Sequence, residues 1–385
     1  MRALMAVEAV CRERSALTGL PHVIALIDTF ADTSVSLSLE RVVMLKDVGL
    51  LDRILGHYAS GNARVLKPID LEYRGDQEYD TVMRFENVLK AAAQRGMMSV
   101  VRWVLMARPD IQVADSMFAA ACSAHLDVLQ WLHENAENMK GFKSCLMDGA
   151  AKHGQVDVLK WLHVHRPREC TVEAMNRAAQ FGHLETVQWL HENRSEGCTT
   201  AAMDYAAQSG HLDVVKWLHL NRTEGCSKWA MNRAALTGQI EVITWLHENR
   251  TEGCTSDAMD SAAQGGHLEV VQWLHKNRSE GCSKHAMNRA ASNGHFEIVK
   301  WLHANRQEGC TALAMNRAAA NGHLEVVKWL HENREEGCTT AAMDEAARNG
   351  NLEVIKWMYA NRNEGFSEKG MIYASENGLR KFLPH

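Results

Sequence analysis

The sequence repeats itself every 28 residues over most of its length. A tryptophan marks the same point in ten successive copies, and every interval is 28 residues except the one from Trp131 to Trp161, which is 30. The ten are Trp103, Trp131, Trp161, Trp189, Trp217, Trp245, Trp273, Trp301, Trp329 and Trp357. A fixed period of about 20–50 residues is typical of stacked repeats, which grow by adding units rather than by enlarging one core. The period therefore predicts a solenoid rather than two or three globular domains.

Each copy contains two helical segments joined by short turns. In the copy that starts at Thr199, this residue can cap a first helix whose packing face has the pattern Ala-Met-x-x-Ala-Ala. Gly210 ends that helix in the left-handed conformation. A second helix over residues 211–221 has apolar residues along one face. Two short antiparallel helices cannot bury both faces alone, so the copies must stack. The predicted fold is an all-α, elongated and curved solenoid, roughly 100 Å long for units about 8–10 Å apart.

Two regions differ in their relation to the repeat. Residues 85–385 form an array of ten full copies and a shortened capping copy that starts at Ser367. Residues 1–84 do not carry the repeat, and we interpret them as an irregular helical cap over the first copy. An alternative interpretation compares the string LPHVIALIDTF, which starts at Leu20, with the start of an F-box. That alternative makes the protein a substrate adaptor of a ubiquitin ligase.

The repeat resembles the ankyrin repeat. The similarity is carried by the string GHLEVVKWL, which starts at Gly322, and by the Ala-Ala pair shortly before it; it covers residues 85–385. The resemblance implies a protein-interaction module whose first helices line a concave surface. A typical ankyrin repeat has about 33 residues, and the shorter period here implies a stunted β-hairpin finger, with partner contacts moved onto the first helices. Similar tryptophan-bearing arrays occur in filamentous eukaryotic pathogens, where some are host-directed effectors.

Cysteine usage indicates a reducing, intracellular setting. The formal net charge is −5, and ten cysteines are present, seven of them at the 28-residue period. Stacked helices lie about 8–10 Å apart, beyond the reach of about 7 Å for a disulfide, so these thiols are expected to be small buried residues. The N-terminus makes a weak signal peptide, and no stretch is long and apolar enough for a membrane span. We expect the cytoplasm or the nucleus.

Three further columns follow the period. The tryptophans, flanked by Val and Leu, are interpreted as core. The histidines that follow Trp-Leu, such as His219, stand too far apart to share a zinc ion, and we expect them to bond connector backbone. A ladder carries Asp or Asn in near-alternation, for example Asp204 and Asn232, and an arginine such as Arg233 follows Asn but never Asp. We interpret this ladder as a brace in which arginine reaches an aspartate one copy away; a per-repeat recognition code is the alternative.

Positions that vary while their neighbours repeat form one exposed stripe on the first helices, at spacing i, i+4, i+7. Tyr205, Trp229 and Arg233 are of the types enriched in binding hot spots, and with His285 and Arg289 we expect them to be central to partner recognition. Neutral drift of a solvated face is the alternative. The predicted partner-binding residues are Glu173, Arg177, Tyr205, Gln208, Trp229, Arg233, Leu236, Asp257, His285, Arg289, Leu313, Arg317 and Arg348.

Catalytic function is not indicated. No phosphate-binding glycine loop, paired carboxylates or Cys/His set stands apart from the period, so we expect no enzyme activity, no cofactor, no metal and no small-molecule substrate. The stripe mixes arginines with Glu173, Asp257 and the aspartate ladder, whereas phosphate binding needs a basic track. We therefore rank nucleic-acid binding third, after a protein-binding scaffold and a ligase adaptor. The predicted protein is a monomeric protein-binding scaffold or adaptor with no membrane contact.

Overall fold

The computed structural model of the protein describes residues 77–135 and 146–378. These residues contain twenty-one helices and no strand, which confirms the all-α prediction. In each repeat a first helix is followed by a second. The first helices are α5 (Gln77–Gln94), α7 (Ala114–Cys122), α9 (Leu146–Lys152), α11 (Val172–Gln180), α13 (Thr200–Ser209), α15 (Lys228–Leu236), α17 (Asp257–Gly265), α19 (Lys284–Ser292), α21 (Ala312–Ala320), α23 (Thr340–Arg348) and α25 (Glu368–Glu376).

The second helices are ten residues long and end four residues after the tryptophan, at an asparagine in all but α6 and α10. They are α6 (Met98–Ala107), α8 (Leu126–Asn135), α10 (Val156–His165), α12 (Leu184–Asn193), α14 (Leu212–Asn221), α16 (Ile240–Asn249), α18 (Leu268–Asn277), α20 (Phe296–Asn305), α22 (Leu324–Asn333) and α24 (Leu352–Asn361). The chain divides into two compact units. Of the described residues, the first unit holds 77–135, 146–150 and 160–165, and the second holds 151–159 and 166–378.

Sequence signals at both ends of the first helices are confirmed. The hydroxyl of Thr199 accepts the N–H of Ala201 at 3.2 Å, and Ser227 accepts that of Trp229 at 3.1 Å. Thr339 is an exception, because its side chain makes no such bond. At the other end Gly210 has φ of 81°, a left-handed conformation that costs an L side chain about 1–2 kcal/mol. Local chemistry therefore fixes where most first helices of the second unit start and stop.

In the second unit the core is a continuous layer between the two rows of helices. Each first helix packs on the first helix of the next repeat, from α11 against α13 to α23 against α25, and also on its own second helix. Ala206, Ala207 and Met203 of α13 are buried, as are Val214, Val215 and Leu218 of α14. Small alanines let neighbouring first helices approach closely, whereas neighbouring second helices touch only lightly.

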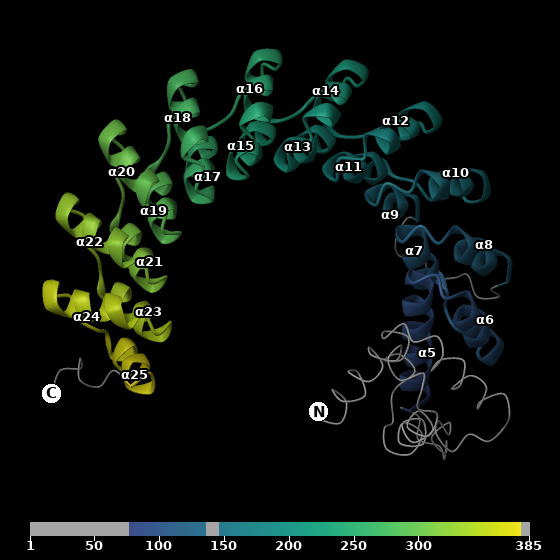
Figure 1. The fold of residues 1–385 in the computed structure, drawn as a ribbon, viewed down its shortest axis with the longest axis horizontal. Coiled ribbons are helices and arrows are strands. Elements are labelled where there is room, and N and C mark those ends of the chain that lie inside the picture. The colour runs from purple at the N-terminus through teal and green to yellow at the C-terminus, as the bar shows by residue number, and fades with distance from the viewer. Residues whose placement is uncertain (1–76, 136–145, 379–385) are drawn as a thin grey trace, which may run out of the picture. The chain divides into compact units, whose positions relative to one another are not determined.

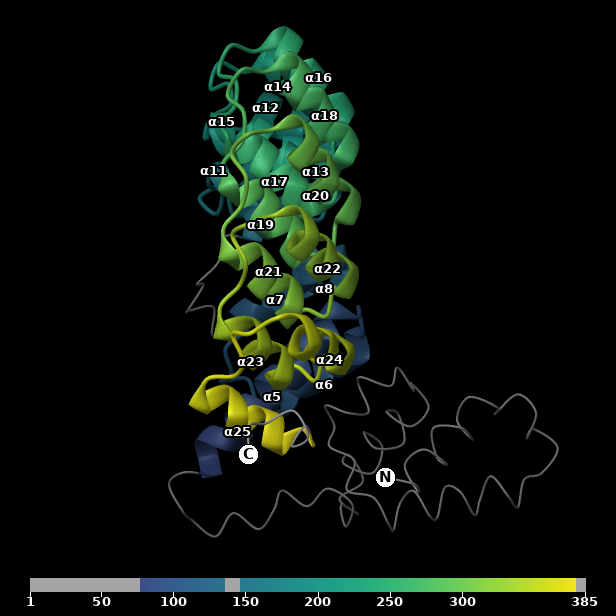
Figure 2. The ribbon, with the colours of Figure 1, turned by 90° about the vertical axis from the view of Figure 1, so that its left-hand side faces the viewer.

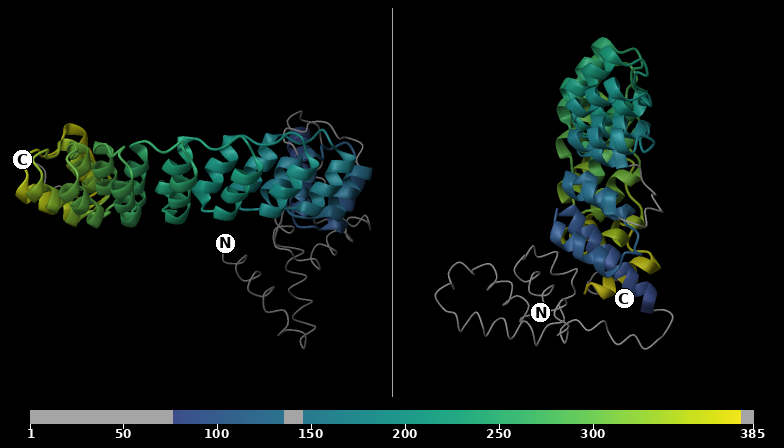
Figure 3. Two further views of the ribbon diagram at one scale, coloured as in Figure 1. Left: turned by 90° about the horizontal axis from the view of Figure 1, so that it is seen from above. Right: turned by 90° about the vertical axis from the view of Figure 1, so that its right-hand side faces the viewer.

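The unequal packing bends the second unit. First helices form the inner side of an arc and second helices form the outer side (Figure 1). Figure 2 shows the arc from its C-terminal end, where α23, α24 and α25 lie. Seen from above, the teal and green helices stand side by side with their axes across the arc (Figure 3). The side of each first helix that contacts neither a second helix nor a neighbouring first helix therefore faces the inside of the arc.

Some predictions fall on residues outside the described ranges. The F-box comparison at Leu20 and nearly all of the proposed cap over residues 1–84 lie there, since description begins at residue 77. They stay predictions.

Candidate partner-binding face and the joints between repeats

All thirteen predicted partner-binding residues lie on the first helices α11 to α23 of the second unit, and none of them is buried. Trp229 is 55% exposed and Leu313 44% exposed, although both are large and apolar. Because the second helices cover the opposite side, these residues lie along the inner side of the arc. We call this surface the inner stripe. Its binding role stays a prediction.

Aromatic and cationic side chains of the inner stripe contact one another in two places. The guanidinium of Arg233 lies 5.1 Å from the centre of the Trp229 ring and donates to Gln208 at 3.2 Å. The guanidinium of Arg177 lies 5.6 Å from the Tyr205 ring and pairs with the carboxylate of Glu173 at 3.0 Å. Cation–π contacts hold rings and guanidinium groups in fixed relative positions while both stay accessible. The stripe is thus partly ordered before any partner arrives.

The Asp/Asn ladder braces neighbouring repeats, but through the capping hydroxyl rather than through arginine. Asp204 accepts the N–H of Ser227 at 2.8 Å and its hydroxyl at 2.7 Å. Asn232 accepts the N–H of Thr255 at 3.1 Å, and its own NH₂ group donates to the Thr255 hydroxyl at 2.9 Å. The prediction that arginine reaches an aspartate one copy away is wrong for Arg177 and Arg233, because each bonds other partners on the exposed side.

The braces follow a pairing rule across seven joints. At these joints an aspartate is followed one repeat later by Ser and an asparagine by Thr, whereas Asp148, which is followed by Thr171, departs from the rule. A carboxylate can only accept, so the hydroxyl must turn its hydrogen toward it, whereas the asparagine amide donates to the hydroxyl instead. The pairs are Asp204–Ser227, Asp260–Ser283, Asp344–Ser367, Asn176–Thr199, Asn232–Thr255, Asn288–Thr311 and Asn316–Thr339.

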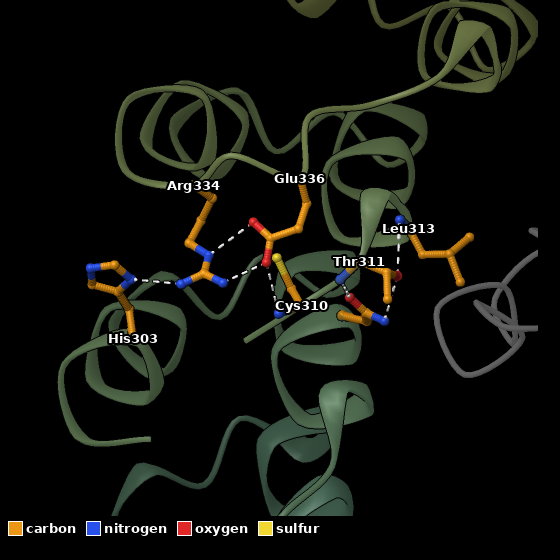
Figure 4. A network of polar contacts seen from close by, with 7 residues as sticks. His303, Cys310, Thr311, Leu313, Arg334 and Glu336 are labelled. Carbon is orange, nitrogen blue, oxygen red and sulfur yellow. Dashed lines mark hydrogen bonds and ion pairs between the residues drawn. The ribbon is translucent and has the colours of Figure 1, made fainter. Parts of the chain in front are cut away.

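A second joint links the outer helices to the connectors. Arg334 pairs with Glu336, two residues later, and donates to Nδ1 of His303 in the preceding repeat at 3.4 Å (Figure 4). Glu336 also accepts the backbone N–H of Cys310 at 3.4 Å. The expectation that these histidines bond connector backbone is wrong at six joints, because an arginine side chain is their partner. The pairs are His191–Arg222, His219–Arg250, His247–Arg278, His275–Arg306, His303–Arg334 and His331–Arg362.

Each tryptophan of the second unit from Trp217 to Trp357 packs against this joint. His219 of the preceding repeat meets the ring of Trp245 edge-on, with centroids 5.2 Å apart. All ten column tryptophans are partly exposed, so their assignment to the core is only half correct. A large ring fits between splayed outer helices because alanine-lined inner helices already fill the centre of the stack.

Most connector cysteines are buried, and burial favours the protonated thiol. Burial is the main cause that raises the pKa of Cys226 to about 12 and that of Cys254 to about 11. A protonated, buried thiol is neither a nucleophile nor a ready metal ligand. Among residues 77–135 and 146–378, no group of three or more His, Cys, Asp or Glu side chains is placed to hold a metal ion. No helix in that same part of the chain has the length and apolar character that crossing a membrane requires.

The comparisons with known proteins agree with the repeat geometry. The family model for ankyrin repeats (3 copies) matches residues 146–232, 175–260 and 258–339. A search of curated proteins gives no match. The matched stretches run from residue 146 to residue 339, about half of the chain, over the helix pairs described above. Ankyrin repeats form protein–protein interaction modules. The chain belongs to the ankyrin repeat family.

Proposed function

We propose that the protein is a non-catalytic scaffold or adaptor that binds a protein partner on the inner stripe. Stacked repeats use extended curved surfaces for recognition, and here the inner side of the first helices is the surface where the repeats differ. The same helices keep the Ala-Met-x-x-Ala-Ala pattern on their buried side, so variation is confined to the accessible face.

Trp229 carries the proposal. It is the one tryptophan outside the 28-residue column, it is 55% exposed, and Arg233 lies against its ring. An exposed tryptophan has no stabilising role in the stack comparable to that of the half-buried column members. Tryptophan and arginine together are the side chains that most often dominate binding energy in protein interfaces.

The test is affinity capture with mass spectrometry, comparing the full-length chain with a Trp229→Ala/Arg233→Glu double variant. We expect at least one partner to be lost, because truncation of a central hot-spot residue commonly costs about 2 kcal/mol or more of binding free energy.

The matched control changes the same kinds of side chain on the outer side. Leu220 and Lys216 on α14 are both exposed, so a Leu220→Ala/Lys216→Glu variant alters apolar area and charge without touching the inner stripe. Partners lost in the first variant and kept in the second support the proposal. An identical partner list for the wild type and the Trp229 variant contradicts it.

A further inference from the structure

Charge on the inner side of the second unit is unevenly distributed. Between residues 227 and 322, the first helices carry five cationic residues: Lys228, Arg233, Lys284, Arg289 and Arg317. Their two acidic residues are Asp257 and Asp260, and Asp260 is buried against Ser283. Only Asp257 therefore offers an exposed carboxylate on this segment. We call the five residues the cationic segment.

The cationic segment forms no salt bridge within the described residues, although Asp204 lies near enough to Arg233 to feel its charge. Several other arginines have carboxylate partners: Arg177 pairs with Glu173, Arg348 with Glu345 at 3.4 Å, and connector arginines such as Arg222 with a glutamate two residues later. In contrast, the salt bridges of residues 77–135 and 146–378 include none of the five. Arg233 bonds only the neutral Gln208 and the Trp229 ring.

Outer helices carry no excess of positive charge, because α16 has two glutamates and no lysine or arginine, and α18 and α20 each have one glutamate and one lysine. Their first turns carry exposed glutamates, such as Glu241 on α16, Glu269 on α18 and Glu325 on α22. The whole chain has a formal net charge of −5. An acidic molecule is therefore attracted to the cationic segment more than to the outer helices, which favours both its encounter and its orientation.

We infer that the cationic segment binds an extended acidic segment of a partner protein, and that apolar side chains of this partner segment pack on Trp229 and Leu313. This inference rests on the proposed function and names the chemistry of its partner. Neighbouring first helices lie about 8–10 Å apart and an extended chain advances about 3.3–3.6 Å per residue, so one repeat spans roughly three residues. In the bound partner segment, carboxylates that face Arg289 and Arg317 are therefore about three residues apart, and carboxylates that face Arg233 and Arg289 are about six residues apart.

Asp257 favours a protein over a nucleic acid. It lies on α17, between the cations of α15 and those of α19, where a continuous polyanion places phosphates against it. A polypeptide can place a neutral or basic residue at that point and still offer carboxylates on either side. Four repeats supply only five cations here, which is sparse for a backbone that carries one charge per nucleotide.

The test measures fluorescence anisotropy with the full-length chain and labelled peptides of about twelve residues, long enough to cover four first helices. One peptide carries Asp or Glu at every third position and Leu between; a second has Asn or Gln in place of each acid; a third probe is a twelve-nucleotide oligouridylate RNA. We expect the acidic peptide to bind, its affinity to fall with ionic strength, and the amide peptide to bind at least about tenfold more weakly.

Matched charge reversals locate the binding. An Arg289→Glu/Arg317→Glu variant should lose about tenfold or more in affinity for the acidic peptide, and the milder Arg289→Gln/Arg317→Gln variant should lose part of it. A Lys216→Glu/Lys276→Glu variant on outer helices α14 and α18 should bind as the wild type does. Circular dichroism at neutral pH checks that each variant is folded.

Three outcomes overturn the inference: no binding of the acidic peptide, equal binding of the amide peptide, or tighter binding of the RNA that the same reversals abolish. Failure of the proposed function looks different. If partners captured from cells depend on Trp229 but persist unchanged in the Arg289→Glu/Arg317→Glu variant, the inner stripe binds proteins and only the acidic character of the partner is wrong.

Discussion

Arg222 joins two repeats from the connector between them. Its guanidinium pairs with Glu224 and donates to His191 of the preceding repeat, and both acidic and basic side chains of the pair are only 23% exposed. Partial burial strengthens such a pair relative to one on an open surface. Burial itself raises the pKa of Glu224, but hydrogen bonds from Arg222 and from backbone amides outweigh it and hold the pKa at about 2.

A Glu224→Gln variant should therefore be less stable than the wild type at neutral pH, and this difference should shrink as the pH falls toward 2. The lowered folded-state pKa means that Glu224 stabilises the fold above its unfolded value of about 4.5, and that this contribution disappears as pH falls toward 2. We expect a loss of about 1–3 kcal/mol at pH 7. Urea unfolding of both proteins across this pH range measures the difference.

The control for this substitution is Glu248→Gln, which changes an exposed glutamate on α16 and should alter stability little. A gap between wild type and the Glu224 variant that stays constant from pH 7 down to pH 2 contradicts the assigned role.

At the scale of the helix pair, the turn glycines serve two purposes that differ between repeats. Gly238 has φ of 77°, and a Cβ at this residue comes within 2.5 Å of Nδ1 of His267 in the next repeat. Nε2 of the same imidazole lies 3.1 Å from the carbonyl oxygen of Leu236. Gly350 has nearly the same φ, 75°, but nothing lies within 4 Å of the corresponding Cβ position.

These two glycines make a matched pair for measuring the joint. Both Gly→Ala substitutions incur a left-handed strain of about 1–2 kcal/mol. Gly238→Ala also displaces His267 from Leu236, which should add about 1 kcal/mol. We expect the Gly238 variant to be the less stable of the two in urea unfolding, with faster hydrogen exchange in α18. Equal losses in both variants show that the imidazole contact contributes nothing.

At the scale of the molecule, the sequence predicted what depends on local chemistry and periodicity. Helix caps, left-handed glycines and the all-α stack are recorded in single residues or in their spacing, so they can be derived without coordinates. The partners of His303 and Asn232 could not be derived this way. Each lies one repeat away, and several hydrogen-bonding residues recur with the same period, so spacing alone cannot show which two columns meet. The Asp–Ser and Asn–Thr pairing was the available signal, since those residues covary along the chain.

Stacked identical joints also predict that the array tolerates loss of a whole period. Deleting residues 255–282 removes α17 and α18, joins Cys254 to Ser283, and brings the hydroxyl of Ser283 to the place where Thr255 met Asn232. Because each repeat contacts only its neighbours, we expect unchanged helix content per residue and a cooperative unfolding transition in circular dichroism. Deleting residues 255–268 instead places two second helices in succession, with no first helix to cover the alanines of α15, and should unfold that region.

The full-period deletion also brings Arg233 one repeat, about 8–10 Å, closer to Arg289. Peptides with acids about three residues apart should then replace those with acids about six apart as the preferred ligands for these two arginines. If both deletions unfold the chain to the same extent, the repeats are not independent modules, because the register of the stack must then depend on contacts longer than one joint.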